Sequence, residues 1–388
     1  MCNYSTVGGG YGNAIQSGSD SSTIAGGSAN SIQDNSSAGT IGGGSGNSVQ
    51  AFASTVAGGY LNTIQAKGNY SFVGGGFGNT IQADGNSYYG SVIGGGHQCM
   101  IQSNAYNSVI GGGDQNVIQT NANQSFIGGG VLNTVQAGSW LSFVGCGDGN
   151  TIKPGCPRSF IGGGSVNTIQ SGRSVIGGGG YNTVSGSDSV VPGGYGNTAS
   201  GDDSFAAGMN ANAAHSSSFV WSDGNTTTTT GARQFMVRCT GGAIFYTASG
   251  TGTGVQVASG GGSWSSLSDR DAKENFAPVD AKGVLEKVAG MPITTWNYRA
   301  QTGSTRHIGP MAQDFYAAFG VGEDERHITT VDEDGVALAA IQGLNQKLEA
   351  RLKEKDEEIG TLKAGADELE RRLSSLEQIH NSKHSSNP

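Results

Sequence analysis

A twelve-residue block recurs through the first half of the chain and limits the folds that it can adopt. The block has the form S-x-[IV]-[GA]-G-G-x-x-N-x-[IV]-Q and is clear at 5–16 and at 125–136. Self-similarity at a fixed period predicts stacked structural repeats rather than one globular domain. Thirteen repeats follow, mostly 17 residues apart, if the asparagine column is used as the marker: Asn13, Asn30, Asn47, Asn62, Asn79, Cys99, Asn116, Asn133, Asn150, Asn167, Asn182, Asn197 and Asn212.

Each repeat also carries two apolar columns, which predict two short β-strands per turn. One column begins at Val7, Ile24 and Ile41, and the other at Ile15 and Ile32. The glycines between them permit positive φ and close backbone approach, and asparagine tolerates the left-handed conformation. The body is therefore predicted to be mostly β, a parallel β-roll or β-solenoid. Because one turn offers only two apolar side chains, one chain has a thin core, and we expect an obligate homo-oligomer.

Composition divides the chain into two parts. Residues 1–200 hold 47 of the 69 glycines but only 4 Lys/Arg, 6 Asp and no Glu, whereas residues 268–388 hold 15 basic and 21 acidic side chains. The net charge is −9 and no basic cluster occurs, so a nucleic-acid partner is not expected. Without an apolar run of 18 residues or a basic start followed by one, neither membrane insertion nor a signal peptide is expected.

The five cysteines lack the C-x-x-C spacing of zinc and redox sites, so we predict no metal and no cofactor. Cys146 and Cys156 either pair within the body or remain free thiols. The scattered Asp residues of the body, without any Glu, do not form the carboxylate pair that a glycosidase needs. The body is therefore expected to bind rather than to cleave.

The repeat block resembles the head repeats of trimeric autotransporter adhesins, which are left-handed parallel β-rolls built from three chains. The segment Asp203-Ser204-Phe205-Ala206-Ala207-Gly208, continued through His215 to Val220-Trp221-Ser222-Asp223, is similar to the end of such repeats in phage tail fibres. This resemblance implies a homotrimer. The repeats here are longer than those of the adhesins and no membrane barrel follows them, so secretion by the autotransporter route is not expected.

The outer surface of the body offers two candidate binding features. Aromatic residues follow the glycines at Tyr11, Tyr60, Phe77 and Tyr195, and beside amides and hydroxyls they are candidates for holding sugar rings; otherwise they cover the adjacent coil or a subunit seam. A hydroxyl column raises ice binding as a rival, although β propensity alone explains threonines in strands. Its members are Ser31, Ser48, Thr63, Thr80, Thr134, Thr151, Thr168, Thr183 and Thr198, with breaks at Met100 and Val117.

The junction and the C-terminal part give the remaining boundaries. Strand-like stretches at 234–239 and 243–246 precede a Gly/Ser-rich linker that we expect to be flexible. The predicted divisions are 1–223 for the roll, 224–267 for a β neck and linker, 268–339 for a small α+β domain, 340–380 for a trimeric α-helical coiled coil, and 381–388 for a disordered tail. Inside the small domain we predict a helix at 281–289, strands at 293–298 and 328–331, and an acidic turn at 332–335.

Three motifs of the small domain carry a second resemblance. Ser-Asp-x-x-x-Lys-Glu-Asn-Phe from Ser268, Trp-Asn-Tyr from Trp296 and His-Ile-Gly-x-Met-Ala-Gln-Asp from His307 resemble the intramolecular chaperone domain of endosialidase-type tailspikes, also found in phage fibres. Pro310 departs from the usual aromatic residue after the glycine. The resemblance implies that the domain directs trimer folding and then cuts the chain before its first serine, here between Leu267 and Ser268.

The same resemblance implies roles for single residues. A serine hydroxyl is inert until a nearby group takes its proton, so Ser268 is the candidate nucleophile and Lys273 the candidate general base. The amine accepts a proton only when uncharged, a form that desolvation or a neighbouring positive charge favours. His307 either assists this dyad or is a structural strand residue. The expected activity is a single-turnover, self-cleaving serine endopeptidase without external substrates.

A heptad pattern runs through the C-terminal tail. Six heptads place Leu338, Asn345, Leu352, Ile359, Ala366 and Leu373 at position a, with Ile341, Leu348, Lys355, Leu362, Leu369 and Leu376 at position d. This pattern is typical of a coiled coil, in which the polar Asn345 and Lys355 fix the register and the number of strands.

Together these features predict a receptor-binding or host-attachment fibre of a phage or a phage-like contractile particle. We expect it to be made in the bacterial cytoplasm and carried on the virion or particle tail. Its expected partners are two further copies of the chain, a host cell-surface glycan or other receptor, and tail or baseplate proteins. The alternative is a bacterial surface or secreted trimeric adhesin with the same autoproteolytic maturation.

Overall fold

The computed structural model describes residues 1–82, 89–249 and 253–384, and the chain forms two compact units. The first unit covers Met1–Gly242 and the second begins at Ala243. We describe each unit by itself. Among the described residues, no helix is both long and apolar enough to cross a membrane.

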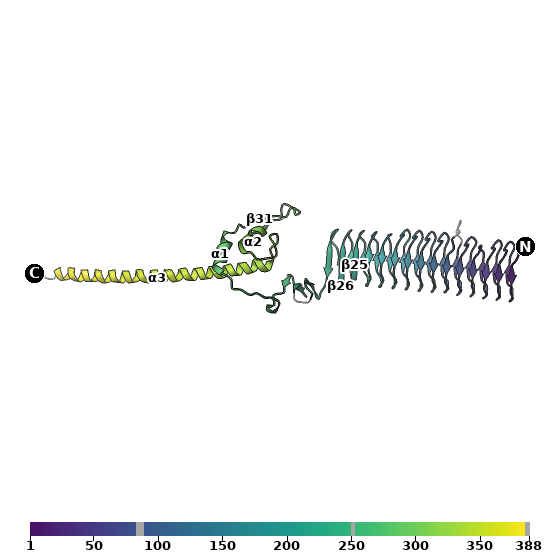
Figure 1. Cartoon of the computed structure of the whole chain (residues 1–388), viewed down its shortest axis with the longest axis horizontal. Coiled ribbons are helices and arrows are strands. Elements are labelled where there is room, and N and C mark those ends of the chain that lie inside the picture. Colours follow the sequence, from purple (N-terminus) through teal and green to yellow (C-terminus); the bar gives the residue numbers. More distant parts are fainter. Residues whose placement is uncertain (83–88, 250–252, 385–388) are drawn as a thin grey trace. The chain divides into compact units, whose positions relative to one another are not determined.

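The first unit is a parallel β-solenoid of about thirteen turns, as predicted. Figure 1 shows its strands stacked as successive rungs. Each turn contributes one two-residue strand to each of two faces, and every strand pairs in parallel with the equivalent strand of the next turn. The odd-numbered face consists of β1 (Thr6–Val7), β3 (Thr23–Ile24), β5 (Thr40–Ile41), β7 (Thr55–Val56), β9 (Phe72–Val73), β11 (Val92–Ile93), β13 (Val109–Ile110), β15 (Phe126–Ile127), β17 (Phe143–Val144), β19 (Phe160–Ile161), β21 (Val175–Ile176) and β23 (Val190–Val191).

The second face and the last turns complete the solenoid. The even-numbered face consists of β2 (Ala14–Ile15), β4 (Ser31–Ile32), β6 (Ser48–Val49), β8 (Thr63–Ile64), β10 (Thr80–Ile81), β12 (Met100–Ile101), β14 (Val117–Ile118), β16 (Thr134–Val135), β18 (Thr151–Ile152), β20 (Thr168–Ile169), β22 (Thr183–Val184) and β24 (Thr198–Ala199). The longer strands β25 (Phe205–Ala213), β26 (Phe219–Thr228) and β27 (Phe235–Arg238) follow. The roll therefore continues past residue 223 to Arg238.

The second residue of each strand points inward and forms the core. From Ile24 to Val191 on the odd face, and from Ile32 to Ala199 on the even face, these side chains are fully buried or nearly so. This confirms that both apolar columns are internal, and a single chain is enough to close them off from water. Only the first turn is open, because Val7 has no turn before it and is 46% exposed.

A ladder of buried asparagine side chains joins the turns. The Asn150 amide donates from Nδ2 to the carbonyls of Cys146 at 3.1 Å and Gly164 at 2.9 Å, while its Oδ1 accepts from the backbone N–H of Asn167 at 3.1 Å. One side chain thus forms hydrogen bonds with backbone groups of both its own turn and the next turn. Leaving those buried polar groups without partners would be costly. The ladder explains why asparagine marks the repeat.

The spacing predicts Asn212 as the last member of the asparagine column, and this prediction is wrong. The backbone N–H of Ala211 donates to Asn197 Oδ1 at 3.0 Å and so occupies the next rung of the ladder. Asn212 lies one residue later and pairs with Thr198, on the outward position of the strand. A register shift between Met209 and Ala211, where β25 pairs with β26, accompanies this change.

Serine and glycine complete the turns. Ser125 Oγ donates to the carbonyl of Ser139 at 3.2 Å and accepts from the N–H of Ser142 at 3.3 Å, in a second buried ladder. Gly130 has a φ of 90°, and a Cβ added there would collide with the Gly147 carbonyl oxygen of the next turn. Only glycine meets both demands, which accounts for the glycine content of the body.

Over the described residues 243–249 and 253–384, the second unit contains a small sheet, three α-helices and a two-stranded ribbon. Figure 1 labels α1, α2, α3 and the ribbon strand β31. The sheet is formed by β28 (Gly242–Tyr246), β29 (Gly254–Ala258) and β30 (Ser265–Ser266), followed by the 3-10 turn η1 (Arg270–Ala272). Then come α1 (Ala281–Gly290), β31 (Thr294–Trp296), β32 (His307–Gly309), α2 (Ala312–Phe319) and the long α3 (Thr330–His384). Helix α1 packs on α3, where a Cβ on Gly343 would collide with the Ala281 carbonyl oxygen.

Several local predictions for this unit are wrong. The strand expected at 328–331 and the turn at 332–335 are replaced by the start of α3. Thr329 Oγ1 accepts from the Asp332 N–H at 3.1 Å and donates to the Asp332 carboxylate at 2.7 Å, which caps this helix. The Gly/Ser-rich segment holds β29, so it is not wholly linker, and α3 passes residue 380; the last tail residues, 385–388, lie outside the described residues.

Candidate functional site

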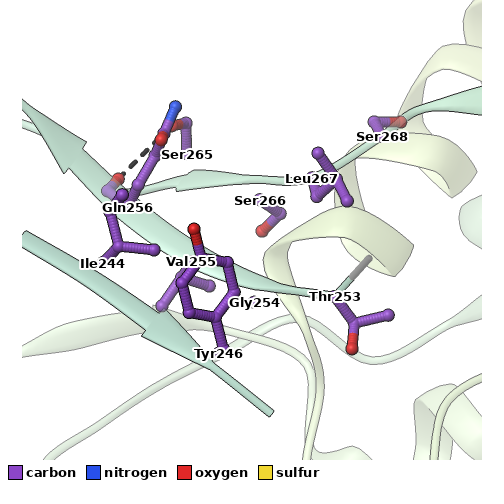
Figure 2. Close-up of a pocket in the computed structure, with 10 residues that line it drawn as sticks. All are labelled: Ile244, Tyr246, Thr253, Gly254, Val255, Gln256, Ser265, Ser266, Leu267 and Ser268. Atoms are coloured by element: carbon purple, nitrogen blue, oxygen red, sulfur yellow. Dashed lines mark hydrogen bonds between the residues drawn. The ribbon is translucent and has the colours of Figure 1, made fainter. Parts of the chain in front are cut away.

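The predicted cleavage point follows directly after a strand. In β30, Ser266 pairs with Val255 and Ser265 with Gln256, antiparallel to β29. Figure 2 shows a hydrogen bond at this edge of the sheet, which Ser265 Oγ donates to the Gln256 carbonyl oxygen at 3.3 Å. The strand pairing therefore keeps the chain extended as it enters the Leu267–Ser268 bond.

A cavity of about 320 Å³ lies along the same sheet. Its lining includes Ile244 and Tyr246 of β28, Val255 of β29, and Leu267 with Ser268 (Figure 2). Leu267 is 47% exposed and Ser268 is also exposed, so the peptide bond between them lies near the surface of the single chain.

The 3-10 turn η1 brings the chain back on itself directly after this bond. Asp269 is the N-cap of the turn, and its Oδ1 accepts from the Asp271 N–H at 3.0 Å. Lys273 closes the turn through its own N–H, which donates to the Arg270 carbonyl at 3.2 Å. As a result, Lys273 Nζ lies 2.7 Å from Ser268 Oγ, within hydrogen-bonding distance.

This arrangement brings together the two residues predicted as nucleophile and base. Their separation lies within the range that direct proton transfer between a nucleophile and a general base requires. Both side chains are exposed in the single chain, where Lys273 Nζ donates this hydrogen bond to Ser268 Oγ. The amine must first lose its proton to act as a base, which removal from water would favour.

His307 has a structural environment of its own. It lies on β32, where it pairs with Trp296 of β31, and the two rings are 4.7 Å apart. Its Nε2 atom is 2.9 Å from Gln301 Oε1. Within the part of the chain that the structure describes, no hydrogen bond joins His307 to Ser268 or Lys273, which favours the structural interpretation.

The aromatic residues predicted to bind sugars share one edge of the roll. Tyr11, Tyr60, Phe77 and Tyr195 all occupy the single-residue bridges that link successive turns. Tyr60 and Phe77 stack at 5.4 Å, whereas Tyr11 and Tyr195 lie in other turns. Phe77 is covered by rings on both sides, whereas Tyr60 has one ring face toward Ser45. Tyr11 and Tyr195 are also exposed, at 84% and 51%.

Sequence reasoning missed His97, which continues this stack. Its ring lies 5.2 Å from that of Phe77, and its Nδ1 is 2.6 Å from Asp114 Oδ1. His97 and Asp114 could have been identified from the sequence, because they occupy the same position of successive repeats as Tyr60 and Phe77.

The cysteines and acidic residues give no sign of a metal site among the described residues, which hold no group of three or more potential ligands. All five cysteines are free, so Cys146 and Cys156 do not pair. Cys146 is exposed, whereas Cys156 is buried and its burial raises the pKa of the thiol.

Comparison with known families identifies the segment that begins at the candidate nucleophile. Residues 268–321 match the Peptidase S74 family, described as the chaperone of endosialidase. This part of the chain is thus similar to an intramolecular chaperone with self-cleaving peptidase activity, and the match suggests a trimeric tail fibre or adhesin matured by autoproteolysis. Among curated proteins, none matches this chain.

Proposed function

We propose that this chain forms a homotrimeric host-attachment fibre of a phage or phage-like contractile particle, whose C-terminal chaperone removes itself by cutting Leu267–Ser268. The observation that carries the proposal is the 2.7 Å distance between Lys273 Nζ and Ser268 Oγ, at the first residue of the matched segment. Ser268 is the nucleophile and Lys273 the general base.

The reaction proceeds as an acyl transfer followed by hydrolysis. The uncharged Lys273 amine takes the proton from Ser268 Oγ, which attacks the carbonyl carbon of Leu267. As the C–N bond breaks, Lys273 passes this proton to the Ser268 nitrogen, which becomes a free amine. Leu267 is left esterified to Ser268 Oγ. Water then hydrolyses the ester, which frees the Leu267 carboxyl group and restores the serine hydroxyl.

Assembly provides the timing of this step. In the single chain both dyad side chains are exposed to water, and a general base has to be an uncharged amine. When three chains associate, neighbouring surfaces exclude water from the dyad and favour the free amine. Cleavage therefore follows correct assembly instead of preceding it.

The test is the size of the purified chain on a denaturing gel. Wild type should give fragments 1–267 and 268–388, while Ser268→Ala and Lys273→Ala should remain whole. Lys273→Arg keeps the positive charge but stays protonated, so it should also remain whole. The control Ser266→Ala changes a neighbouring serine on β30 and should be cut normally. Cleavage of Ser268→Ala at the same bond would contradict the proposal.

Host attachment requires a test of its own. The open ring face of Tyr60 supports a sugar ligand on the body, because carbohydrate rings pack on exposed aromatic faces. A glycan array probed with the cleaved body should show binding that Tyr60→Ala reduces, while Phe77→Leu, at a ring covered on both faces, should bind as wild type does. An array without a single bound glycan would leave a protein receptor as the target.

Gene neighbourhood separates the phage-like particle from the bacterial adhesin. Tail and baseplate genes nearby would indicate the particle, and genes of an export system would indicate the adhesin.

A further inference from the structure

One outward column of the roll is apolar over most of its length. On the odd face, the first residue of each strand points outward, and the strands pair in register from turn to turn. From Phe72 in β9 to Phe235 in β27 every position of this column is Phe or Val, and we call it the seam column. Ten steps between rungs give it a length of roughly 48 Å.

The rings of the seam column form a smooth surface. Phe126, Phe143 and Phe160 stack with nearly parallel planes at 5.0 and 4.9 Å. Two residues after each of these rings stands a glycine, and a Cβ added at Gly145 would lie 3.4 Å from the Phe143 ring. The rings thus lie beside bare glycine backbone, without a side chain that would project beyond them.

This surface remains partly exposed in the single chain. Phe72, Phe126 and Phe160 are 36–39% exposed, although each already stacks on or pairs with its neighbours. The apolar surface widens at the last turns, where Trp221 stands beside Phe219 and Val237 beside Phe235, which is 74% exposed. A continuous exposed apolar strip of this kind marks an interaction surface.

The other outward columns differ in chemistry. The first residues of the even-face strands are mostly Ser and Thr, as in Thr134, Thr151 and Thr168. The bridge column includes Asp114 and Asp148. The seam column alone among these three combines aromatic rings with the absence of charge over the described turns.

We propose that the seam column is the contact by which the bodies of several copies of this chain associate side by side. Rotational symmetry about an axis parallel to the roll sets each column against the same column of the next copy, at equal height. A charged column would repel its own copies, whereas Phe and Val rungs of equal spacing pack together. The inference rests on the homo-oligomer of the proposed function and names its surface.

The order of residues along the chain supports a second copy as the occupant. The column is polar in the first turns, with Thr6, Thr23, Thr40 and Thr55, and becomes apolar and then wider toward the end from which the chain continues to α3. Helix α3 carries its own exposed apolar stripe at the heptad positions, which include Leu338 and Leu352. Copies held together by α3 would thus meet first at the widest part of the seam.

A photo-crosslinker tests the seam in the full chain. Phe143→p-benzoylphenylalanine in β17 keeps an aromatic residue in place, and Thr151→p-benzoylphenylalanine in β18 is the control on the opposite face of the same turn. After illumination, a denaturing gel should show covalently crosslinked multiples of the body when the crosslinker is at position 143. It should show none when the crosslinker is at position 151. Equal multiples from both positions, or none from 143, would overturn the inference.

A second variant measures association without a label. Threonine occupies the same column in the first turns, so Phe126→Thr/Phe143→Thr/Phe160→Thr keeps a side chain that the roll accepts. The cleaved body of this variant should fall to the monomer mass in light scattering, and retention of the oligomer mass would refute the seam. Fragment sizes separate the two proposals. Bodies that are cleaved at Leu267–Ser268 but not crosslinked to one another contradict only the seam. Chains that are crosslinked but not cleaved contradict only the self-cleavage.

Discussion

At the scale of single residues, the asparagine ladder has one natural gap that shows what the amide contributes. Cys99 takes the place of asparagine, and its Sγ lies 3.6 Å from the Gly113 carbonyl and 3.7 Å from that of Gly112. A thiol is only a weak donor, and it cannot reproduce the donor and acceptor set of an amide. The turn around Cys99 therefore lacks hydrogen bonds that the other turns of the ladder possess.

Restoring the amide should stabilise the roll. Cys99→Asn places Nδ2 near the Gly113 carbonyl and Oδ1 near the Asn116 N–H, for an expected gain of about 1–2 kcal/mol in the free energy of unfolding. Thermal unfolding of the body measures the change. Cys99→Ala is the control and should not gain stability, and a Cys99→Asn midpoint equal to that of Cys99→Ala would contradict the role of the ladder.

The same substitution has a pH dependence with a defined sign. Burial raises the pKa of the Cys99 and Cys156 thiols above the value of 9.0 that the unfolded chain retains. Between the unfolded and folded pKa values the unfolded state holds fewer protons, so folding stability falls as the pH rises above about 9. Cys99→Asn removes one of the two thiols and should therefore lose less stability than wild type in that range.

At the scale of secondary structure, the capped 3-10 turn places Lys273, the proposed base, beside Ser268, the proposed nucleophile. The Asp269 carboxylate accepts from the Asp271 N–H at one end of the turn, and Lys273 lies at the other end. Asp269 does not contact the Ser268 hydroxyl through any hydrogen bond that the described residues make, so its role is positioning.

Loss of this cap should slow self-cleavage without abolishing it. Removing a capping side chain costs about 1 kcal/mol, which corresponds to a cleavage rate roughly fivefold lower for Asp269→Ala. Asp269→Asn retains a capping oxygen and should cleave at nearly the wild-type rate. The control Asp271→Ala alters an exposed carboxylate of the same turn, and a loss in that variant as large as in Asp269→Ala would show that charge, not capping, is responsible. The measurement is the time course of fragment appearance after synthesis.

The same scale shows what the sequence could predict. The period of the block predicted the strands and buried columns, because each turn repeats one local rule. Asn212 has the spacing of the asparagine column but does not belong to it, because the register shifts in β25. The start of α3 was missed although Thr329 and Asp332 form a capping pair, since the β-branched run from Ile328 to Val331 favours a strand. The strand β29 was hidden by surrounding Gly and Ser, and only the alternation of Val255 and Val257 indicates it.

The dyad was predicted by resemblance, and its geometry required the structure. A Ser and a Lys five residues apart usually belong to unrelated surface positions. The 3-10 turn between them is short, and its capping aspartate lies in a charged stretch that has no periodic pattern. Pairing of β30 with β29 also depends on residues that are separated by a glycine-rich segment, so local sequence rules could not predict that the bond before Ser268 is held at a sheet edge.

At the scale of the whole molecule, the two units differ in what a single chain can bury. The roll closes its own core, whereas the apolar heptad positions of α3 remain exposed. Deleting 340–388 removes that helix stripe and with it the expected means of holding copies together at one end. We predict that the shortened chain yields misfolded, aggregated body, measured as the soluble fraction after expression. Deleting only 385–388 is the control and should leave the yield unchanged, and a soluble oligomeric body without 340–388 would contradict the chaperone role.

The proposed self-cleavage would have a consequence for the lifetime of the folded body. While the proposed chaperone is attached, the element that guides assembly would also provide a route back to the unfolded chain. Under the proposed function, cutting Leu267–Ser268 would release the chaperone and remove that route, so the associated bodies would unfold only over a higher barrier. Stability then depends on the unfolding rate rather than on the equilibrium free energy alone.

We therefore predict that cleaved wild type and uncleaved Ser268→Ala have the same fold but different unfolding rates. Circular dichroism should give matching spectra, while the half-life in SDS or at elevated temperature should be longer for the cleaved body. Lys273→Ala is a second uncleaved form that leaves the serine in place, and it should unfold as fast as Ser268→Ala. Equal half-lives for cleaved and uncleaved protein at one temperature would reject this kinetic role, and exposure of a receptor-binding tip would then be the better reason for cutting the chain.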